Sequence, residues 1–340
     1  MVSPHRRPLV IGHRGAPGYR PEHSAASYRL ACELGADLVE PDIVATSDGV
    51  LVVRHENEIS GTTDVADHPE FADRRTTKVV DGDRLTGWFT EDFTWDELAT
   101  LGSRERLPRL RPDNTEYDGA EGILRLRDVF AIIDEQSAKQ GREIGVVVEI
   151  KHARFYEDRG IDLAALLLAE LASTRWDDRR DRLVIECFEL GVLERVRAAG
   201  VLAEIVFLTE YVGAPADEPV GDAPARSYSW YRSDAGLDFL ADRVDGVSVA
   251  KANLMRLSVL GKALGPTNLV ARAHARGLRV YTWTLRPENK FLNARFHAAG
   301  GGAAWGDWQA EFAMIASSGV DGIFVDHPDL GVAMRETLGD

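Results

Sequence analysis

Strand-like and helix-like stretches alternate along this 340-residue chain from end to end. Such alternation favours an α/β fold with a parallel sheet, because parallel neighbours must be joined by crossover segments that are usually helices. The strand-like stretches are Pro8–Gly12, Asp37–Val44, Ile144–Ile150, Arg182–Cys187, Ala203–Leu208, Gly246–Ala250, Leu278–Thr284 and Asp321–Val325. Eight strands are the number needed for a closed TIM (β/α)₈ barrel of about 250 residues. We therefore expect a single barrel over residues 1–340, with length to spare for an insertion.

Several of the helical stretches have recognisable start and stop signals. Ser24 is a suitable cap for a helix that runs to Gly35, and Leu126–Gln140 follows the helical period and ends before Gly141. Further helices are expected at Ile161–Thr174, Leu190–Ala199, Gly236–Arg243, Thr267–Arg276, Gln309–Ser318 and Asp329–Leu338.

Two segments depart from this alternation of strands and helices. Residues 57–121 are rich in charge, Gly and Pro, with one short helical piece at Trp95–Leu101. We interpret them as an insertion after the second strand, on the barrel face where active sites lie. The loop Gly213–Ser233 ends in Tyr228, Trp230 and Tyr231, and either packs on the surface or forms a wall of a substrate pocket.

The composition excludes several classes of partner. A net charge of -15 argues against nucleic acid and anionic membranes, since no basic field is available to neutralise phosphates. No run of 18 apolar residues occurs, so no stable membrane insertion is expected. Met1–Pro8 is too short and polar for a signal peptide, which predicts a cytoplasmic protein, or a secreted one if a leader precedes this sequence. Cys32 and Cys187 lie in apolar stretches and are expected to be core residues rather than a disulfide. The oligomeric state is left open.

The pair Glu40 and Asp42 is the first candidate for chemistry. Two residues apart on a strand, both side chains face the same way, and they repel unless a cation lies between them. Pro41 between them suggests that regular strand pairing ends there. Hard oxygen ligands suit Ca²⁺, Mg²⁺ or Mn²⁺. The alternative is a solvated acidic turn.

A second strand at Val50–His55 brings a histidine towards this pair. Asp48-Gly49 is a strong turn signal between the two stretches. A two-residue loop would place Asp42 directly opposite His55, with Cβ atoms about 5 Å apart. His55 would then lie beside the proposed cation.

Other candidates follow the first and third strands. Glu149 ends the most apolar strand and is either a third carboxylate ligand or the partner of Lys151 in an ion pair. His13 is either a structural histidine or, with His55, half of an acid–base pair, because an imidazole titrates near neutrality. Arg14 offers a planar fork for phosphate oxygens.

Two late motifs are ambiguous. Trp283, near the end of the seventh strand, is either barrel packing or an apolar wall beside the substrate. Asp326 follows the eighth strand and either orients a catalytic group or caps the next helix, and we favour capping.

Taken together, these pieces resemble the glycerophosphodiester phosphodiesterase family. The matching motifs are His13-Arg14-Gly15, Pro21-Glu22-His23-Ser24, Gly35 to Asp42, Thr46-x-Asp48-Gly49, Val52-Val53-Arg54-His55, Glu149-Ile150-Lys151, Thr282-Trp283-Thr284 and Asp326-His327-Pro328. They run in order from residue 9 to about residue 335. The large insertion and the segment from Glu149 to Phe155 resemble the longer bacterial form, some of whose members are secreted and use Ca²⁺.

The resemblance implies a TIM barrel with an insertion after the second strand. It implies one divalent cation, Ca²⁺ or Mg²⁺, held by Glu40, Asp42 and Glu149. It further implies acid–base catalysis by His13 and His55, and phosphate contacts from Arg14 and Lys151. The activity implied is hydrolysis of small glycerophosphodiesters to sn-glycerol 3-phosphate and an alcohol.

The sequence departs from the family at Glu56, where many relatives have Asp after the second histidine, and in Asn57-Glu58-Ile59, which lacks the usual Pro. These differences leave the preferred alcohol open. Our hypothesis makes His13 the base and His55 the acid. Two alternatives are a phospholipase D-like or sphingomyelinase-type barrel acting on intact lipids, and a binding protein that has lost turnover. The lipid-directed alternative requires an exposed apolar rim, which the charged insertion does not suggest.

Overall fold

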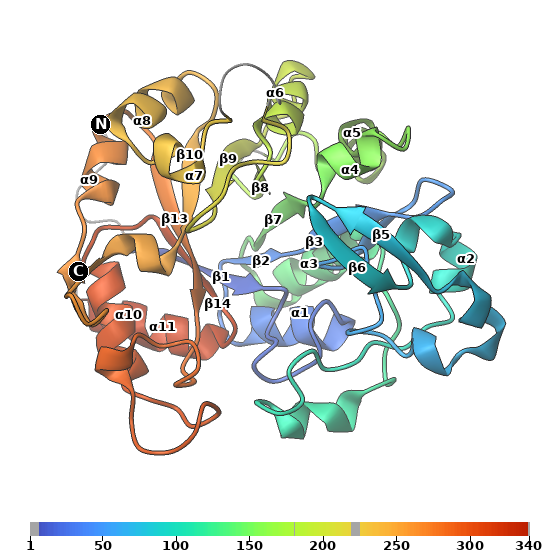
Figure 1. Ribbon diagram of the computed structural model, residues 1–340, viewed down its shortest axis with the longest axis horizontal. Coiled ribbons are helices and arrows are strands. Elements are labelled where there is room, and N and C mark those ends of the chain that lie inside the picture. The colour runs from blue at the N-terminus through green and yellow to red at the C-terminus, as the bar shows by residue number, and fades with distance from the viewer. Residues whose placement is uncertain (1–6, 180, 219–224, 339–340) are drawn as a thin grey trace.

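The computed structural model describes residues 7–179, 181–218 and 225–338 and shows a closed parallel barrel (Figure 1). Around the ring, β1 pairs with β14 and β2, and the pairing of β2 with β7 closes the circle. The barrel strands are β1 (Leu9–His13), β2 (Leu38–Glu40) continued by β3 (Asp42–Ala45), β7 (Gly145–Ile150), β8 (Leu183–Cys187), β9 (Glu204–Thr209), β10 (Gly246–Ala250), β13 (Arg279–Leu285) and β14 (Gly322–Val325). The predicted eight-stranded TIM barrel is confirmed.

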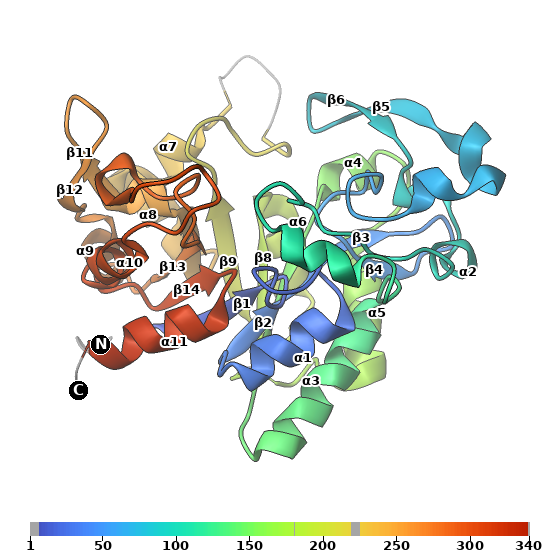
Figure 2. The same ribbon diagram turned by 90° about the horizontal axis from the view of Figure 1, so that it is seen from below.

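Helices surround the strands (Figures 1 and 2). They are α1 (Ala25–Glu33), α2 (Trp95–Leu98), α3 (Leu126–Gln140), α4 (Ala153–Glu157), α5 (Leu163–Thr174), α6 (Leu190–Ala198), α7 (Tyr228–Tyr231), α8 (Asp234–Ala241), α9 (Leu269–His274), α10 (Trp308–Ala316) and α11 (Pro328–Thr337). The start and stop signals act as expected. Ser24 caps α1 by accepting a hydrogen bond from the Ser27 amide, and α3 ends at Gly141, whose φ of 63° is left-handed.

Two apolar layers follow from this arrangement. The larger core lies between strands and helices and includes both cysteines, which are buried and free, as predicted. A smaller cluster of strand side chains is separate from it, as expected for the filled interior of a small barrel. Its buried members are Ile11, Leu38, Val147, Val184, Val206, Tyr281 and Phe324.

The predicted strand Asp37–Val44 is interrupted at Pro41, where regular pairing with β1 ends, as the proline suggested. The chain continues as β3, which pairs with β7 on one side and with β4 (Leu51–Val53) on the other. The predicted register of this hairpin is wrong by one position. Ile43 lies opposite Val53, and the Arg54 amide donates to the Asp42 carbonyl at 3.1 Å. The reason is a longer loop: strand pairing stops at the pair of Ala45 and Leu51, so five residues make the turn instead of two.

Between β4 and α3 the chain forms more structure than the single helical piece expected. It contains the hairpin of β5 (Thr76–Val80) and β6 (Asp83–Gly87), which projects from the barrel in Figure 2, together with α2. Asp81 and Gly82 both have positive φ, the geometry of a tight primed hairpin turn. The remaining pieces of this segment are short 3-10 turns at Val65–Asp67, Pro69–Arg74, Thr90–Asp92 and Pro112–Tyr117.

A second small hairpin, of β11 (Met255–Leu257) and β12 (Ala263–Pro266), was also not predicted. Within the residues described, no helix has the length and apolar character needed to cross a bilayer. Most of Met1–Pro8, on which the argument about a leader rests, lies outside the described residues.

Candidate active site

A cavity of about 1150 Å³ opens where the barrel strands end. The predicted site residues that line it are His13, Arg14, Glu40, His55, Glu149, Lys151 and Trp283. The cavity thus brings together Glu40 just before Pro41, His55 just after β4 and Glu149 near the end of β7, which are far apart in the chain. This is the end of a TIM barrel at which active sites are found.

Three carboxylates converge beside this cavity. One oxygen from each of Glu40, Asp42 and Glu149 lies within 4.8 Å of the other two, and all three residues are buried. Strand register produces the convergence, because Asp42 lies directly opposite Glu149 on neighbouring strands. Among the described residues, Oε1 of Glu40 and Oδ1 of Asp42 find no hydrogen-bond partner. Buried, unpartnered carboxylate oxygens are the donor set that a hard divalent cation requires, so these residues fit the implied metal.

The alternative ion pair of Glu149 is present as well. Nζ of Lys151 lies 2.6 Å from Oε1 of Glu149 and 3.7 Å from Oδ1 of Asp42.

Burial, followed by repulsion from Asp42 and Glu149, raises the pKa of Glu40 well above its usual range. Burial also raises the pKa of Glu149 to about 8, against the opposing effect of Lys151. Burial acts upward on the pKa of Asp42 too, but Lys151 and His55 hold that pKa well below its usual range.

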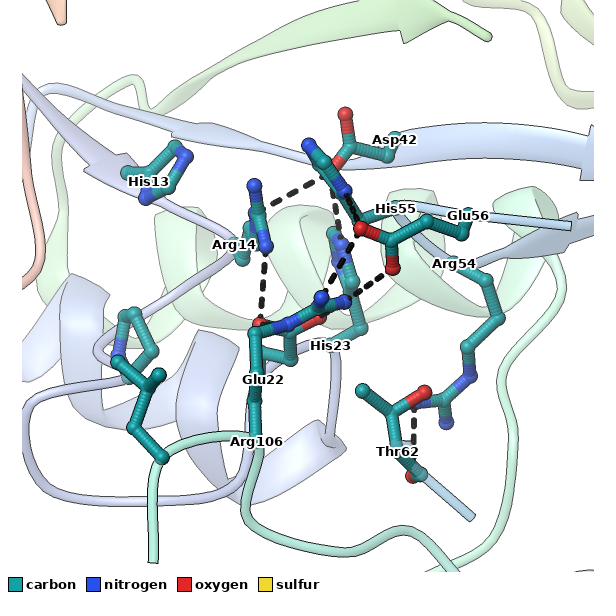
Figure 3. Close-up of polar contacts among 12 residues, drawn as sticks. His13, Arg14, Glu22, His23, Asp42, Arg54, His55, Glu56, Thr62 and Arg106 are labelled. Carbon is teal, nitrogen blue, oxygen red and sulfur yellow. Dashed lines mark hydrogen bonds and ion pairs between the residues drawn. The ribbon is translucent and has the colours of Figure 1, made fainter. Parts of the chain in front are cut away.

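Arg14 connects the first strand to these carboxylates. The chain leaves β1 with a left-handed φ of 56° at Arg14, and the amide of this residue donates to Oε2 of Glu40 at 2.8 Å. The guanidinium donates to Glu22 at 3.0 Å and lies 3.3 Å from Asp42 (Figure 3). Although burial opposes it, these two carboxylates raise the pKa of Arg14. Arg14 is therefore held as a fixed, permanent positive charge at the cavity.

His13 is oriented by Asp326. Nδ1 of His13 lies 2.7 Å from Oδ1 of Asp326, so a proton on Nδ1 would leave Nε2 as the free acceptor. Oδ2 of Asp326 accepts from Arg111 and Arg286, each at 2.6 Å. The expectation that Asp326 caps a helix is wrong, because the residue at the N-cap of α11 is His327. Burial and the charge of Arg14 lower the pKa of His13 to about 4.

His55 has a comparable partner from its own neighbour. Its Nδ1 is hydrogen-bonded to Glu56, and burial, Arg14 and Lys151 lower the pKa of His55 to about 3. Glu56 in turn accepts two hydrogen bonds from Arg106 of the inserted segment, at 2.9 and 2.5 Å. The longer side chain at this departure from the family motif therefore joins His55 to the insertion.

Arg106 also binds Glu22, so that one guanidinium bridges two carboxylates (Figure 3). Its Nε and Nη2 lie 2.7 and 2.6 Å from the two oxygens of Glu22. Sequence reasoning missed Arg106, because one arginine in a charged insertion has no distinguishing spacing. It also gave no role to His23, although this residue belongs to a quoted motif. His23 is buried, with Nε2 3.0 Å from Asp42 and Nδ1 2.7 Å from the Tyr28 hydroxyl.

Glu186 is a fourth buried carboxyl group at the cavity that the sequence analysis missed. It lies opposite Glu149 in the pairing of β7 with β8. Burial, followed by repulsion from Glu149 and Asp42, raises the pKa of Glu186 well above its usual range. An alternation of two along Val184-Ile185-Glu186 could have placed it on the inner face.

Aromatic side chains form another wall. Trp283 lines the cavity with its ring edge-on to Phe188, at 5.7 Å between centroids. Tyr228 also lines the cavity, whereas Trp230 and Tyr231 pack against Phe239. Both interpretations of the loop Gly213–Ser233 are thus partly right, and its residues 219–224 lie outside the described residues.

Comparison with known proteins agrees with this geometry. The profile of the Glycerophosphoryl diester phosphodiesterase family matches residues 13–330. The chain is 31% identical to the Arabidopsis thaliana glycerophosphodiester phosphodiesterase GDPD6, over 94% of this chain and 84% of the relative. It is 25% identical to the Haemophilus influenzae glycerophosphodiester phosphodiesterase, over 95% of this chain and 88% of the relative.

Solved structures show the same fold. A putative glycerophosphoryl diester phosphodiesterase from Silicibacter pomeroyi superimposes with a TM-score of 0.68 at 22% identity, covering 98% of this chain and 95% of that one. An Oleispira antarctica phosphodiesterase, solved in complex with its product sn-glycerol-3-phosphate, gives a TM-score of 0.60 at 18% identity and covers 97% of both chains. On the family match and the Arabidopsis relative, this chain belongs to the glycerophosphoryl diester phosphodiesterase family.

Proposed function

We propose that this chain hydrolyses glycerophosphodiesters to sn-glycerol 3-phosphate and an alcohol, using His13 and His55 for proton transfer beside a divalent cation. The observation that supports this most is the convergence of Glu40, Asp42 and Glu149 next to a cavity lined by both histidines. The product named for the Oleispira antarctica relative agrees with this assignment.

Glu40, Asp42 and Glu149 would hold one Ca²⁺ or Mg²⁺ ion through their oxygens. When bound, such an ion supplies Lewis-acid stabilisation of phosphate charge. It would also offset the mutual repulsion that raises the pKa of Glu40 and Glu149. Arg14 and Lys151 bring further positive charge to the same cavity, and the burial of both side chains strengthens their attraction for a phosphodiester.

The two histidines are suited to opposite steps. His13 is neutral at pH 7 because its pKa is lowered, and Asp326 would stabilise the ring once it accepts a proton from the nucleophile. His55, whose pKa is lowered to about 3 by burial, Arg14 and Lys151, would protonate the leaving alcohol only once it carries a proton, and Glu56 and a bound anionic substrate both favour that charged form.

The test is alcohol release from glycerophosphocholine with Mg²⁺ or Ca²⁺ and after chelation. We expect turnover only with the cation, and losses of at least about 10²-fold in the variants His13→Ala and His55→Ala. His274→Ala is a matched control, because that histidine bonds Asp321 just before β14, at the other end of the barrel. Wild-type rates in either active-site variant would contradict the two-histidine scheme.

A second candidate substrate class is favoured by apolar side chains near the cavity mouth. Val212 and Tyr211 are 72% and 51% exposed, and Val79 on β5 is 55% exposed. Val212 itself lines the cavity. Exposed apolar side chains of this kind are what a lipid-directed phosphodiesterase would use at the rim of its site. Lysophosphatidylcholine, compared with glycerophosphocholine in the same assay, separates the two classes: an acyl-chain preference lost in Val212→Ser would favour the lipid.

A further inference from the structure

Glu186 is a buried acid that the proposed chemistry does not use. It is the fourth residue of β8, only 2% exposed, and it lines the active-site cavity. Within the described part of the chain no hydrogen bond or ion pair reaches its carboxyl group, and Oε2 is fully covered.

The other buried acids of the cavity all have partners in the protein. Glu40 accepts from the Arg14 amide, Glu149 from Lys151, and Glu189 from the Arg154 amide. A buried carboxyl group without any partner is strongly unfavourable, and such groups in native proteins call for an explanation. A partner that arrives with the ligand is one such explanation.

The position of Glu186 limits what this partner can be. As the residue paired with Glu149, it faces the same side of the sheet. It is nevertheless not one of the three residues whose oxygens lie within 4.8 Å of each other. The space beside it therefore suits a ligand oxygen that bridges Glu186 to this cluster. A neutral hydroxyl group suits Glu186 in either protonation state, because it can donate to an ionised carboxylate and accept from a protonated one. A phosphate oxygen, by contrast, is repelled by the ionised form.

We propose that Glu186 binds an O–H group beside the cluster of Glu40, Asp42 and Glu149: the 2-hydroxyl of the substrate's glycerol moiety, replaced by water when no substrate is bound. This inference rests on the proposed function and deepens it. Glu186 then selects for glycerol and directs the phosphate away from itself, towards Arg14. The proposal also predicts that the Glu186 carboxyl group is kept for substrate binding at a cost to the stability of the folded protein.

The test compares Glu186→Gln and Glu186→Leu with the wild type on two substrates, glycerophosphocholine and its analogue that lacks the glycerol 2-hydroxyl. Removal of this partner leaves a buried substrate hydroxyl unpaired, which should lower kcat/KM of Glu186→Leu on glycerophosphocholine by about 10- to 100-fold. The analogue should be hydrolysed at nearly equal rates by the variant and the wild type. Glu189→Gln is the control, since Glu189 lines the same cavity but already has a protein partner.

Two measurements without turnover complete the test. Affinity for Mg²⁺, by calorimetry, should change less than about threefold in Glu186→Leu, and the Tm of the metal-free variant should rise above that of the wild type. A tenfold or greater loss of Mg²⁺ affinity would overturn the inference by making Glu186 a direct ligand. A lower Tm with unchanged discrimination between substrates would overturn it by making Glu186 structural.

Failure of this inference differs from failure of the proposed function. An active wild type whose Glu186 variants treat both substrates alike would contradict only the inference. An inactive wild type would contradict the proposed function. In that case, calorimetric binding of sn-glycerol 3-phosphate in the presence of Mg²⁺ still decides the role of Glu186: equal affinity in wild type and Glu186→Leu would overturn it, and a tenfold weaker variant would support it.

Discussion

Asp326 and His13 lie 313 positions apart in the sequence, yet Oδ1 of Asp326 is 2.7 Å from Nδ1 of His13. The last barrel strand thus ends beside the first, and the aspartate at its end fixes the orientation of the first histidine. Arg111 and Arg286 hold Asp326 in turn.

Replacing Asp326 by Asn should therefore impair catalysis more than folding. An amide cannot stabilise a protonated His13 and permits the wrong tautomer, so we expect kcat to fall by about 10- to 100-fold or more. Steady-state kinetics on glycerophosphocholine measures this. Asp329→Asn is the control, because the Asp329 carboxylate accepts from the Tyr19 hydroxyl and contacts neither histidine of the site in the part of the chain that is described. Equal kcat in Asp326→Asn and wild type would contradict the orienting role.

Arg106 should contribute to stability from within the insertion. Arg106→Ala leaves Glu22, which is 4% exposed, with Arg14 as its remaining partner, and we expect a loss of about 1–3 kcal/mol in the free energy of unfolding. Urea unfolding measures it. Arg104→Ala, two positions away, removes an exposed pair with Asp67 and should change stability by less than about 1 kcal/mol. Similar losses in the two variants would count against the bridge.

Cation binding should stabilise the folded protein. Mg²⁺ or Ca²⁺ at about 100 times its Kd adds about 2.7 kcal/mol, because the unfolded chain does not present the site. Thermal scans with and without chelator should show the rise in Tm for the wild type and none for Glu40→Gln. A rise of the same size in that variant would place the ion elsewhere.

His327 predicts a pH dependence of stability. Burial, followed by the charge of Arg111, lowers its pKa from 6.5 to about 4. Between these pH values the unfolded chain binds a proton that the folded protein does not, so stability falls as the pH falls from 6.5 to 4. One group gives a slope of at most about 1.4 kcal/mol per pH unit. Urea unfolding at several pH values should show a shallower slope for His327→Gln. Parallel slopes would show that His327 is protonated equally in both states.

The sequence was sufficient for the parts governed by local pattern. Apolar runs and caps located the barrel strands and most helices, because their period and end signals are written in neighbouring residues. The meeting of Glu40 with His13 follows from parallel strand ends, and the structure places the two opposite each other. The hairpin β5–β6 could also have been found, since Asp81-Gly82 follows a Thr- and Val-rich run.

Other features depend on contacts that no local pattern encodes. The register of β3 and β4 was missed by one position because the turn signal at Asp48-Gly49 gives a place and not a loop length. Glu186 became a candidate only through its register with Glu149 and its lack of a partner. The partners of His13 and His55 come from the far end of the chain and from the neighbouring residue tied to the insertion.

The bridge from Arg106 sets a limit on how this protein could be shortened. Replacing residues 57–121 by a brief linker changes the entropy of loop closure only modestly. Such a shortened protein would, however, lack the Arg106 guanidinium that lies between Glu22 and Glu56. These two carboxylates contact Arg14 and His55, which line the active-site cavity. The inserted segment therefore supplies a positive charge to the active site as well as covering it. A shortened variant would need another cationic side chain at the position of Arg106.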